Sequence, residues 1–220
     1  MASWMIHLRI ADLLLERIDG LSAKAFIMGN IAPDSGVPNE DWSRFTPSTA
    51  VSHFRRDNGT GKKKIDVASF VNQYFTEDLR RGYNINEYSF FLGYLAHLLT
   101  DSLWSDRIAY PAMAEFLASG NREMIARIKN DWYDLDRLFL RNNLGFRAFQ
   151  IYRTIESFPN TYMDIFGCDA FDNRRGYIVG FYEQEKNNLV REYPFLSQED
   201  ADRFIVEACD EISEILKLYS

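Results

Sequence analysis

The segment that most constrains the fold is residues 90–103, which are mostly apolar and yet contain His97 and Asp101. Its uninterrupted apolar part is about half of the roughly 20 residues that a membrane-spanning helix needs. We therefore expect a buried helix over about residues 88–108, interrupted only by Gly93. A carboxylate inside such a helix costs several kcal/mol unless it meets a cation, hydrogen-bond donors or a metal.

Helical periodicity dominates most of the remaining chain. Apolar residues recur at helical spacing in 4–19, 67–75, 111–117, 124–140, 146–155, 176–193 and 198–219. No alternating run between hairpin turns is long enough to build a sheet. The turn formers in 29–38 predict an irregular loop, 49–56 predicts one or two helical turns, and the polar stretch 57–64 predicts an exposed excursion.

These patterns predict an all-α, single-domain multi-helix bundle over residues 1–220 without an internal repeat. An excess of 32 acidic over 25 basic residues gives a net charge of −7, which argues against an extended nucleic-acid partner. The two cysteines, Cys168 and Cys209, are too few for a disulfide scaffold. Because the sequence shows no export signal and no transmembrane segment, we expect a cytoplasmic protein. Its oligomeric state stays open.

The chain contains three histidines, and all lie in the first 100 residues. His97 and Asp101 are four residues apart, so a helix places both on one face, where they can share a cation. That spacing alone is common by chance, and a core histidine bonded to a backbone carbonyl is the plain alternative. His7 lies in an apolar helical pattern and His53 precedes Phe54. Each of them is therefore also either a metal ligand or a core histidine.

Four blocks in a fixed order carry a resemblance to a known family. They are Trp4-x-x-His7, Gly29-Asn30-Ile31-Ala32-Pro33-Asp34, Ser52-His53-Phe54 and Phe91 to Trp104, the last containing His97-Leu98-Leu99-Thr100-Asp101. Together they closely resemble the zinc-dependent phospholipase C and P1-type nuclease superfamily over roughly residues 4–108. The order of the blocks is more specific than any single block. The helical remainder, 109–220, lies outside the resemblance.

The resemblance implies a zinc site. Carried over residue by residue, it assigns one ion to Asp34, His53, His97 and Asp101, and it assigns His7 to a neighbouring ion toward which Asp101 bridges. It also implies that Asp34 acts as the catalytic general base and that a metal-bound hydroxide attacks the phosphorus. Mixed imidazole and carboxylate ligation suits a hydrolytic metal site on physical grounds as well.

The chain also departs from the family pattern. Trp4 follows Met-Ala-Ser, so it is not the N-terminal residue that chelates a metal in family members with three zincs. No histidine follows His97, whereas the family uses two more and a glutamate for its other metal. Oxygen ligands could substitute, and the candidates are Asp106, Asp131, Asp134 and Glu183, each also readable as a surface or capping acid. We expect one well-formed zinc site, with a second as an open alternative, and not the three-zinc cluster; another divalent transition metal in place of zinc is also an alternative.

Two hypotheses about function remain open at this point. The first is a metal-dependent hydrolase of phosphoric esters acting on a small phosphoester or a phospholipid-derived substrate. The second is a binding or sensing protein of the same fold that has lost part or all of its metals. A helical phosphohydrolase of the adjacent His-Asp type is disfavoured, because no His-Asp dipeptide occurs. Gly59-Thr60-Gly61-Lys62 does not complete a phosphate-binding loop, and Lys62–Lys64 with Arg55 and Arg56 is either an anion-attracting or a solubilising cluster.

Overall fold

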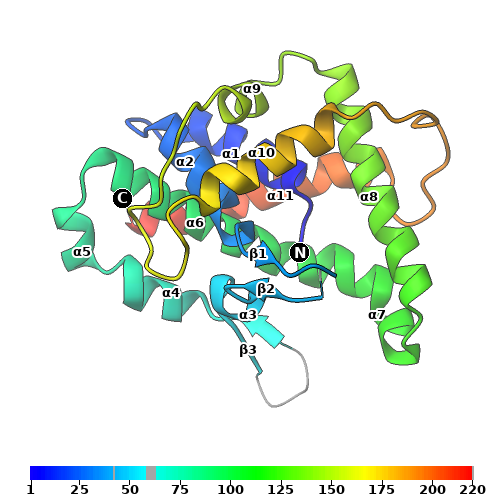
Figure 1. The fold of residues 1–220 in the computed structure, drawn as a ribbon, viewed down its shortest axis with the longest axis horizontal. Coiled ribbons are helices and arrows are strands. Elements are labelled where there is room, and N and C mark those ends of the chain that lie inside the picture. The colour runs from blue at the N-terminus through cyan, green and yellow to red at the C-terminus, as the bar shows by residue number, and fades with distance from the viewer. Residues whose placement is uncertain (42, 58–62, 220) are drawn as a thin grey trace.

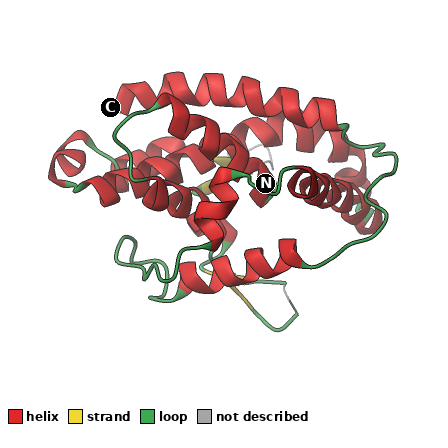
Figure 2. Ribbon diagram, turned by 90° about the horizontal axis from the view of Figure 1, so that it is seen from above, coloured by secondary structure: helices red, strands yellow, loops and turns green. Residues whose placement is uncertain are grey.

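The computed structural model describes residues 1–41, 43–57 and 63–219. Helices make up most of the described chain, so the predicted all-α class is confirmed (Figure 2). Figure 1 places α7 and α8 on one side of the molecule and α4 and α5 on the other. The α-helices are α1 (Trp4–Arg17), α2 (Ala23–Ile31), α3 (Thr49–Ser52), α4 (Val67–Tyr74), α5 (Glu77–Gly82), α6 (Ile85–Trp104), α7 (Tyr110–Ser119), α8 (Arg122–Asn142), α9 (Arg147–Arg153), α10 (Ala170–Glu183) and α11 (Gln198–Leu216).

Helix α6 is the buried helix that the apolar segment predicts. It begins at a capping box in which the Asn84 side chain accepts from the first-turn backbone and the Glu87 side chain accepts from the Asn84 N–H. His97 and Asp101 are fully buried, as are most apolar residues of this helix. The helix continues into a short π-helical segment, Ser105–Ala109, so the expected span of 88–108 is helical throughout.

Two glycines let α2 and α6 approach closely. A side chain at Gly29 would overlap the backbone carbonyl of Phe90, and one at Gly93 would overlap that of Phe26. This packing corrects the prediction of an irregular loop over 29–38, because residues 29–31 continue α2 and a 3-10 turn follows at Ala32–Asp34. The turn formers determine only where α2 ends, because tertiary contact overrides their weak local preference for a loop.

Two short strand pairs correct the expectation that the chain forms no sheet. Strand β1 (Val37–Pro38) pairs with β2 (Phe45–Thr46), and β3 (Arg55–Asp57) pairs with β4 (Lys63–Ile65), both antiparallel. The predicted turns over 49–56 are helical only in α3, because Phe54 adopts a left-handed φ of 51° and turns the chain into β3. Residues 58–62, with the Gly59–Lys62 motif and Lys62 of the lysine run, lie outside the described residues.

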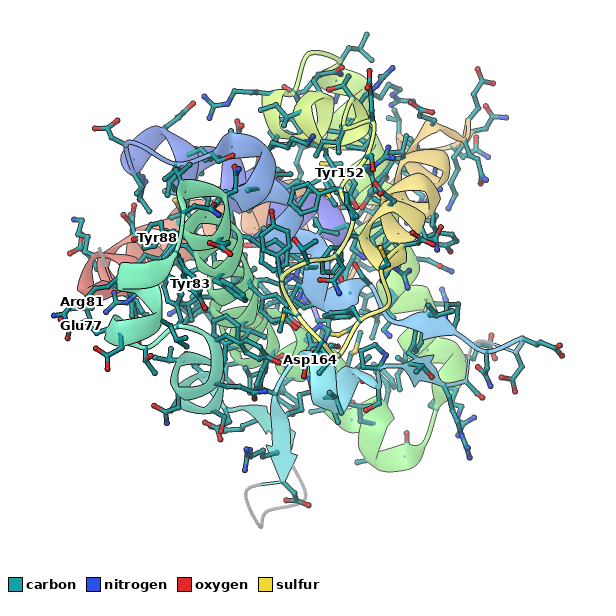
Figure 3. All side chains as sticks on the ribbon, turned by 60° about the vertical axis from the view of Figure 1, so that its left-hand side comes forward. Glu77, Arg81, Tyr83, Tyr88, Tyr152 and Asp164 are labelled. Atoms are coloured by element: carbon teal, nitrogen blue, oxygen red, sulfur yellow. The ribbon has the colours of Figure 1, made fainter. Side chains whose placement is uncertain are left out.

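Helix α5 is absent from the sequence-based expectation. Thr76 caps it, and Figure 3 shows Glu77 and Arg81 together on this helix, where they form an ion pair one turn apart. Helix α10 differs in its bounds, since it begins at Ala170 and ends at Glu183 instead of spanning 176–193. The chain leaves the helix in extended conformation at Gln184, and Asn188 then adopts a left-handed φ of 61°.

The described part of the chain contains no helix that is long and apolar enough to cross a membrane.

Candidate metal centre

Five side chains from four parts of the fold converge beside α6. His7 comes from α1, Asp34 from the 3-10 turn after α2, His53 from the residue after α3, and His97 and Asp101 from α6. The three imidazoles and Asp101 are fully buried, and the Asp34 side chain is 9% exposed. The structure therefore brings together every residue that the sequence assigned to the site.

Asp101 lies between two sets of imidazole nitrogens. Its Oδ1 lies 3.5 Å from His7 Nε2, while its Oδ2 lies 3.7 Å from His53 Nε2 and 3.8 Å from His97 Nε2. His53 Nε2 is also 3.3 Å from Asp34 Oδ1 and 3.2 Å from His97 Nε2. Two groups of three ligand atoms result, one from His7, His97 and Asp101 and one from Asp34, His53 and His97, each with its atoms within 4.8 Å of one another.

The orientation of His97 is set by the backbone of α2. Its Nδ1 lies 2.7 Å from the carbonyl oxygen of Asn30, which can only accept, so Nδ1 carries the proton and Nε2 presents its lone pair to the cluster. Burial, with the nearby His7, lowers the pKa of His97 to about 3 despite the opposing carboxylates. The ring is therefore neutral at physiological pH, as a metal ligand must be.

Asp34 is an ionised carboxylate at the edge of the cluster. Burial by itself would raise its pKa, but the hydrogen bond to His53 and the imidazoles of His97 and His7 outweigh burial and hold the pKa well below its ordinary value. Asp34 also lines an adjoining cavity of about 420 Å³. Asp34 thus lies between the buried imidazoles and a space that a small molecule can enter.

The unpaired atoms of the cluster fit a divalent metal. Both ring nitrogens of His7 and Oδ2 of Asp101 are buried without a hydrogen-bond partner among the described residues. Buried polar atoms are normally paired, so each orphan needs an explanation. A cation would satisfy Asp101 Oδ2 and the one His7 nitrogen that carries a lone pair. Imidazole nitrogen and carboxylate oxygen are the donor types of catalytic zinc sites. The residues present therefore fit the metal that the sequence pattern implies.

Several further residues support or flank the cluster, and among them the backbone N–H of Ala2 donates to Asp101 Oδ1 at 2.7 Å. Ser52 Oγ lies 3.0 Å from His53 Nδ1, and the Asn30 side chain donates to the Gly93 carbonyl at 3.3 Å. Arg55 places its NH2 3.9 Å from Asp101 Oδ2, and its Nε is buried without a partner in the described chain. Sequence reasoning considered Arg55 for attracting anions but did not assign Ser52 or the Asn30 carbonyl. Their adjacency to the histidine and aspartate motifs is the only signal they carry.

The acids considered as substitute ligands do not belong to the cluster of His7, Asp34, His53, His97 and Asp101. Asp134 forms ion pairs with Lys186 and Arg191, and Asp131 pairs with Arg191 at 2.6 Å. The remaining two are exposed: Glu183 lies 3.8 Å from Arg153, and Asp106 is in the π-helical segment. Within the described residues, neither group of potential metal ligands includes any of these acids.

Comparison with known proteins finds a similarity, which lies in the N-terminal part of the chain. The family model described as Zinc dependent phospholipase C matches residues 6–104. No curated protein and no solved structure gives a significant match. The matched segment contains His7, Asp34, His53, His97 and Asp101.

Proposed function

We propose that the chain is a metal-dependent hydrolase of phosphoric esters with the five-residue cluster as its active centre, since residues 6–104 match the family model described as Zinc dependent phospholipase C. The observation that carries the proposal is the convergence of three buried imidazoles and two carboxylates, with orphaned ligand atoms, beside a cavity. A purely structural cluster would be expected to pair its own donors and acceptors.

The proposed ligands of one zinc ion are Asp34, His53, His97 and Asp101. His7 with Asp101 is the proposed position of a second ion, since the two oxygens of Asp101 face the two sets of imidazoles. When bound, such an ion lowers the pKa of water toward neutrality and neutralises charge that develops on phosphoryl oxygens. The proposed substrate is a small phosphoester or a phospholipid-derived molecule. The proposed location of the protein is the cytoplasm.

The side chains of the protein have distinct proposed roles. His97 is held by the Asn30 carbonyl so that its lone pair stays directed into the centre. Asp34, which is ionised and lines the cavity, accepts a proton from the attacking water at a carboxylate oxygen. Arg55, on the rim of the same cavity, offers guanidinium N–H donors to a phosphoryl oxygen.

A binding or sensing protein without a catalytic centre is the rival hypothesis. It is favoured by the absence of any histidine after His97 and by the ion pairs that occupy Asp131 and Asp134. The two hypotheses differ in whether the cluster binds metal and turns over substrate.

The test measures metal content, thermal stability and hydrolysis on protein purified without a histidine tag. Zinc at about 100 times its dissociation constant should stabilise the fold by about 2.7 kcal/mol, which for a chain of this length raises Tm by about 5–10 °C. The zinc-loaded protein should hydrolyse bis-p-nitrophenyl phosphate. His97→Ala should abolish both effects, whereas Asp106→Asn, an exposed acid just beyond α6, should change neither. A wild-type protein that binds no zinc and is not stabilised by it is not this hydrolase.

A further inference from the structure

The cavity beside Asp34 has a positive lining in an acidic protein. Three cationic side chains border it, Arg55, Lys129 and Arg174, and Asp34 is the one carboxylate among the described lining residues. The chain as a whole carries a net charge of −7. A concave site that concentrates one sign of charge against the sign of the whole molecule attracts ligands of the opposite charge.

Arg174, on α10, is a buried cation that has no counter-ion among the described residues. It is 6% exposed, and its NH2 donates to the backbone carbonyl of Gly36 at 2.6 Å. None of the ion pairs among the described residues involves Arg174, whereas the neighbouring Arg175 lies 3.5 Å from Asp172. A buried charge is costly unless it is paired, so this guanidinium has unused capacity for an anion that enters the cavity.

Lys129 adds a second cation from another helix. It lies on α8, is exposed, and forms no ion pair with any described carboxylate. Arg55 borders the cavity next to the metal cluster, where its NH2 lies 3.9 Å from Asp101. The cationic groups are thus contributed by separate elements, one of them directly beside the cluster.

Aromatic side chains line the same cavity, which raises the alternative of a cationic ligand. Trp4, Tyr133, Tyr177 and Phe181 border it, and aromatic rings can bind ammonium groups through their faces. Here the protein's own cations already occupy such faces: Arg174 lies 5.4 Å from the Tyr177 ring centre and Arg137 lies 4.1 Å from that of Phe181. Ligand ammonium would meet like charge, so the aromatic rings favour an apolar carbon portion instead.

We propose that the cavity selects phosphate esters whose alcohol part carries a second anionic group, a carboxylate or a phosphate, which Arg174 and Lys129 bind. The ester phosphate then lies at the cluster beside Arg55, and the carbon portion contacts the aromatic rings. This inference rests on the proposed function, because it takes the cluster as the place where the ester phosphate binds.

The test compares three small phosphate esters that differ in their second group. Calorimetric titration of the zinc-loaded protein uses 2-phosphoglycolate with a carboxylate, ethyl phosphate with no second charge, and phosphocholine with a cation. We expect 2-phosphoglycolate to bind about tenfold or more tightly than ethyl phosphate, the scale of one charge-assisted hydrogen bond, and phosphocholine to bind more weakly.

Lys129→Gln should reduce the affinity for 2-phosphoglycolate severalfold more than it reduces the affinity for ethyl phosphate. Arg127→Gln is the matched control, since Arg127 is exposed on the same helix but borders a different cavity. Arg174→Gln should remove the preference, and if that buried variant does not fold, Lys129→Gln decides. Equal affinity for all three esters, or a preference for phosphocholine, overturns the inference while the hydrolase proposal stands. Failure to bind zinc overturns the hydrolase proposal and is read separately from metal content.

Discussion

The imidazole rings of His7 and His97 stack face to face, with 3.8 Å between their centroids and 2° between their planes. Because the Asn30 carbonyl fixes the orientation of His97, the stack also fixes the ring of His7, which comes from a different helix. The relationship sets the position of α1 against α6 at the proposed metal centre. It also separates two roles of His7, since a ring without nitrogens could stack but could not bind metal.

We expect His7→Phe to keep the fold and the tighter zinc equivalent but to lose the weaker one. Phenylalanine retains a planar ring against His97 and removes the nitrogen that faces Asp101 Oδ1. Zinc titration followed by calorimetry measures both equivalents, with His7→Ala as the comparison that also loses the stack. Loss of the tight equivalent in His7→Phe would show that His7 belongs to the primary site.

Ser52→Ala should weaken zinc binding by about 10- to 100-fold, because residues that orient a ligating histidine typically contribute that much. Ser52 Oγ lies 3.0 Å from His53 Nδ1, and both side chains are buried. Competition with a chromogenic chelator measures the affinity. Ser119→Ala, at an exposed serine on α7, is the control and should leave it unchanged. An unaltered affinity in Ser52→Ala would mean that packing alone orients His53.

Asp34→Asn distinguishes a proton acceptor from a plain ligand. The amide keeps an oxygen toward His53 but cannot take a proton, so kcat should fall by about 10² to 10⁴-fold even when added zinc saturates the protein. Steady-state kinetics at increasing zinc concentration measures this. If saturating zinc restores kcat, Asp34 serves only to hold the ion.

Gly93→Ala should lower the free energy of unfolding by about 1–3 kcal/mol, because the added methyl group would overlap the backbone of α2 and force the helices apart. Urea denaturation measures this. The same shift would displace the Asn30 carbonyl from His97, so zinc affinity should fall as well. Gly176→Ala, where a side chain on α10 meets open space, should be neutral or slightly stabilising. Equal effects of the two substitutions would contradict close packing at Gly93.

Asp136 makes stability depend on pH. Burial raises the pKa of this carboxyl from 3.8 to about 7, despite hydrogen bonds donated by Tyr182 and Ser3. Between these two values the folded state holds a proton that the unfolded state releases, so stability falls as pH rises from about 4 to about 7 and then levels off. Asp136→Asn should remove this contribution, so the difference between variant and wild type in urea denaturation should change across that window. A constant difference would contradict the raised pKa.

Helical periodicity located most helices, but it placed the bounds of α10 wrongly and missed α5. Both failures have local causes. In the sequence, the residues after Glu183 extend the helical repeat of α10, but the helix does not continue there and Asn188 adopts a left-handed φ. Helix α5 is too short and too exposed to show an apolar stripe. The segment 29–31 failed for a tertiary reason, since only contact with α6 makes its turn formers helical.

The candidate ligands were accessible from sequence because each lies in a short motif whose order matched a family. His97 and Asp101 share a face of α6 by spacing alone, which the backbone geometry of a helix guarantees. The sequence by itself thus determined the helical class and the candidate metal ligands.

Only the tertiary structure decided how those residues meet and what surrounds them. Four features depend on segments far apart in the chain: the Asn30 carbonyl beside His97, the stacked His7, the two oxygens of Asp101 directed at different imidazoles, and the hydrogen bond from Arg174 to Gly36. So does the engagement of Asp131 and Asp134 with Arg191. Periodicity reports which face of a helix is apolar, whereas distances between elements depend on how closely the helices pack, and here two glycines between α2 and α6 set that distance.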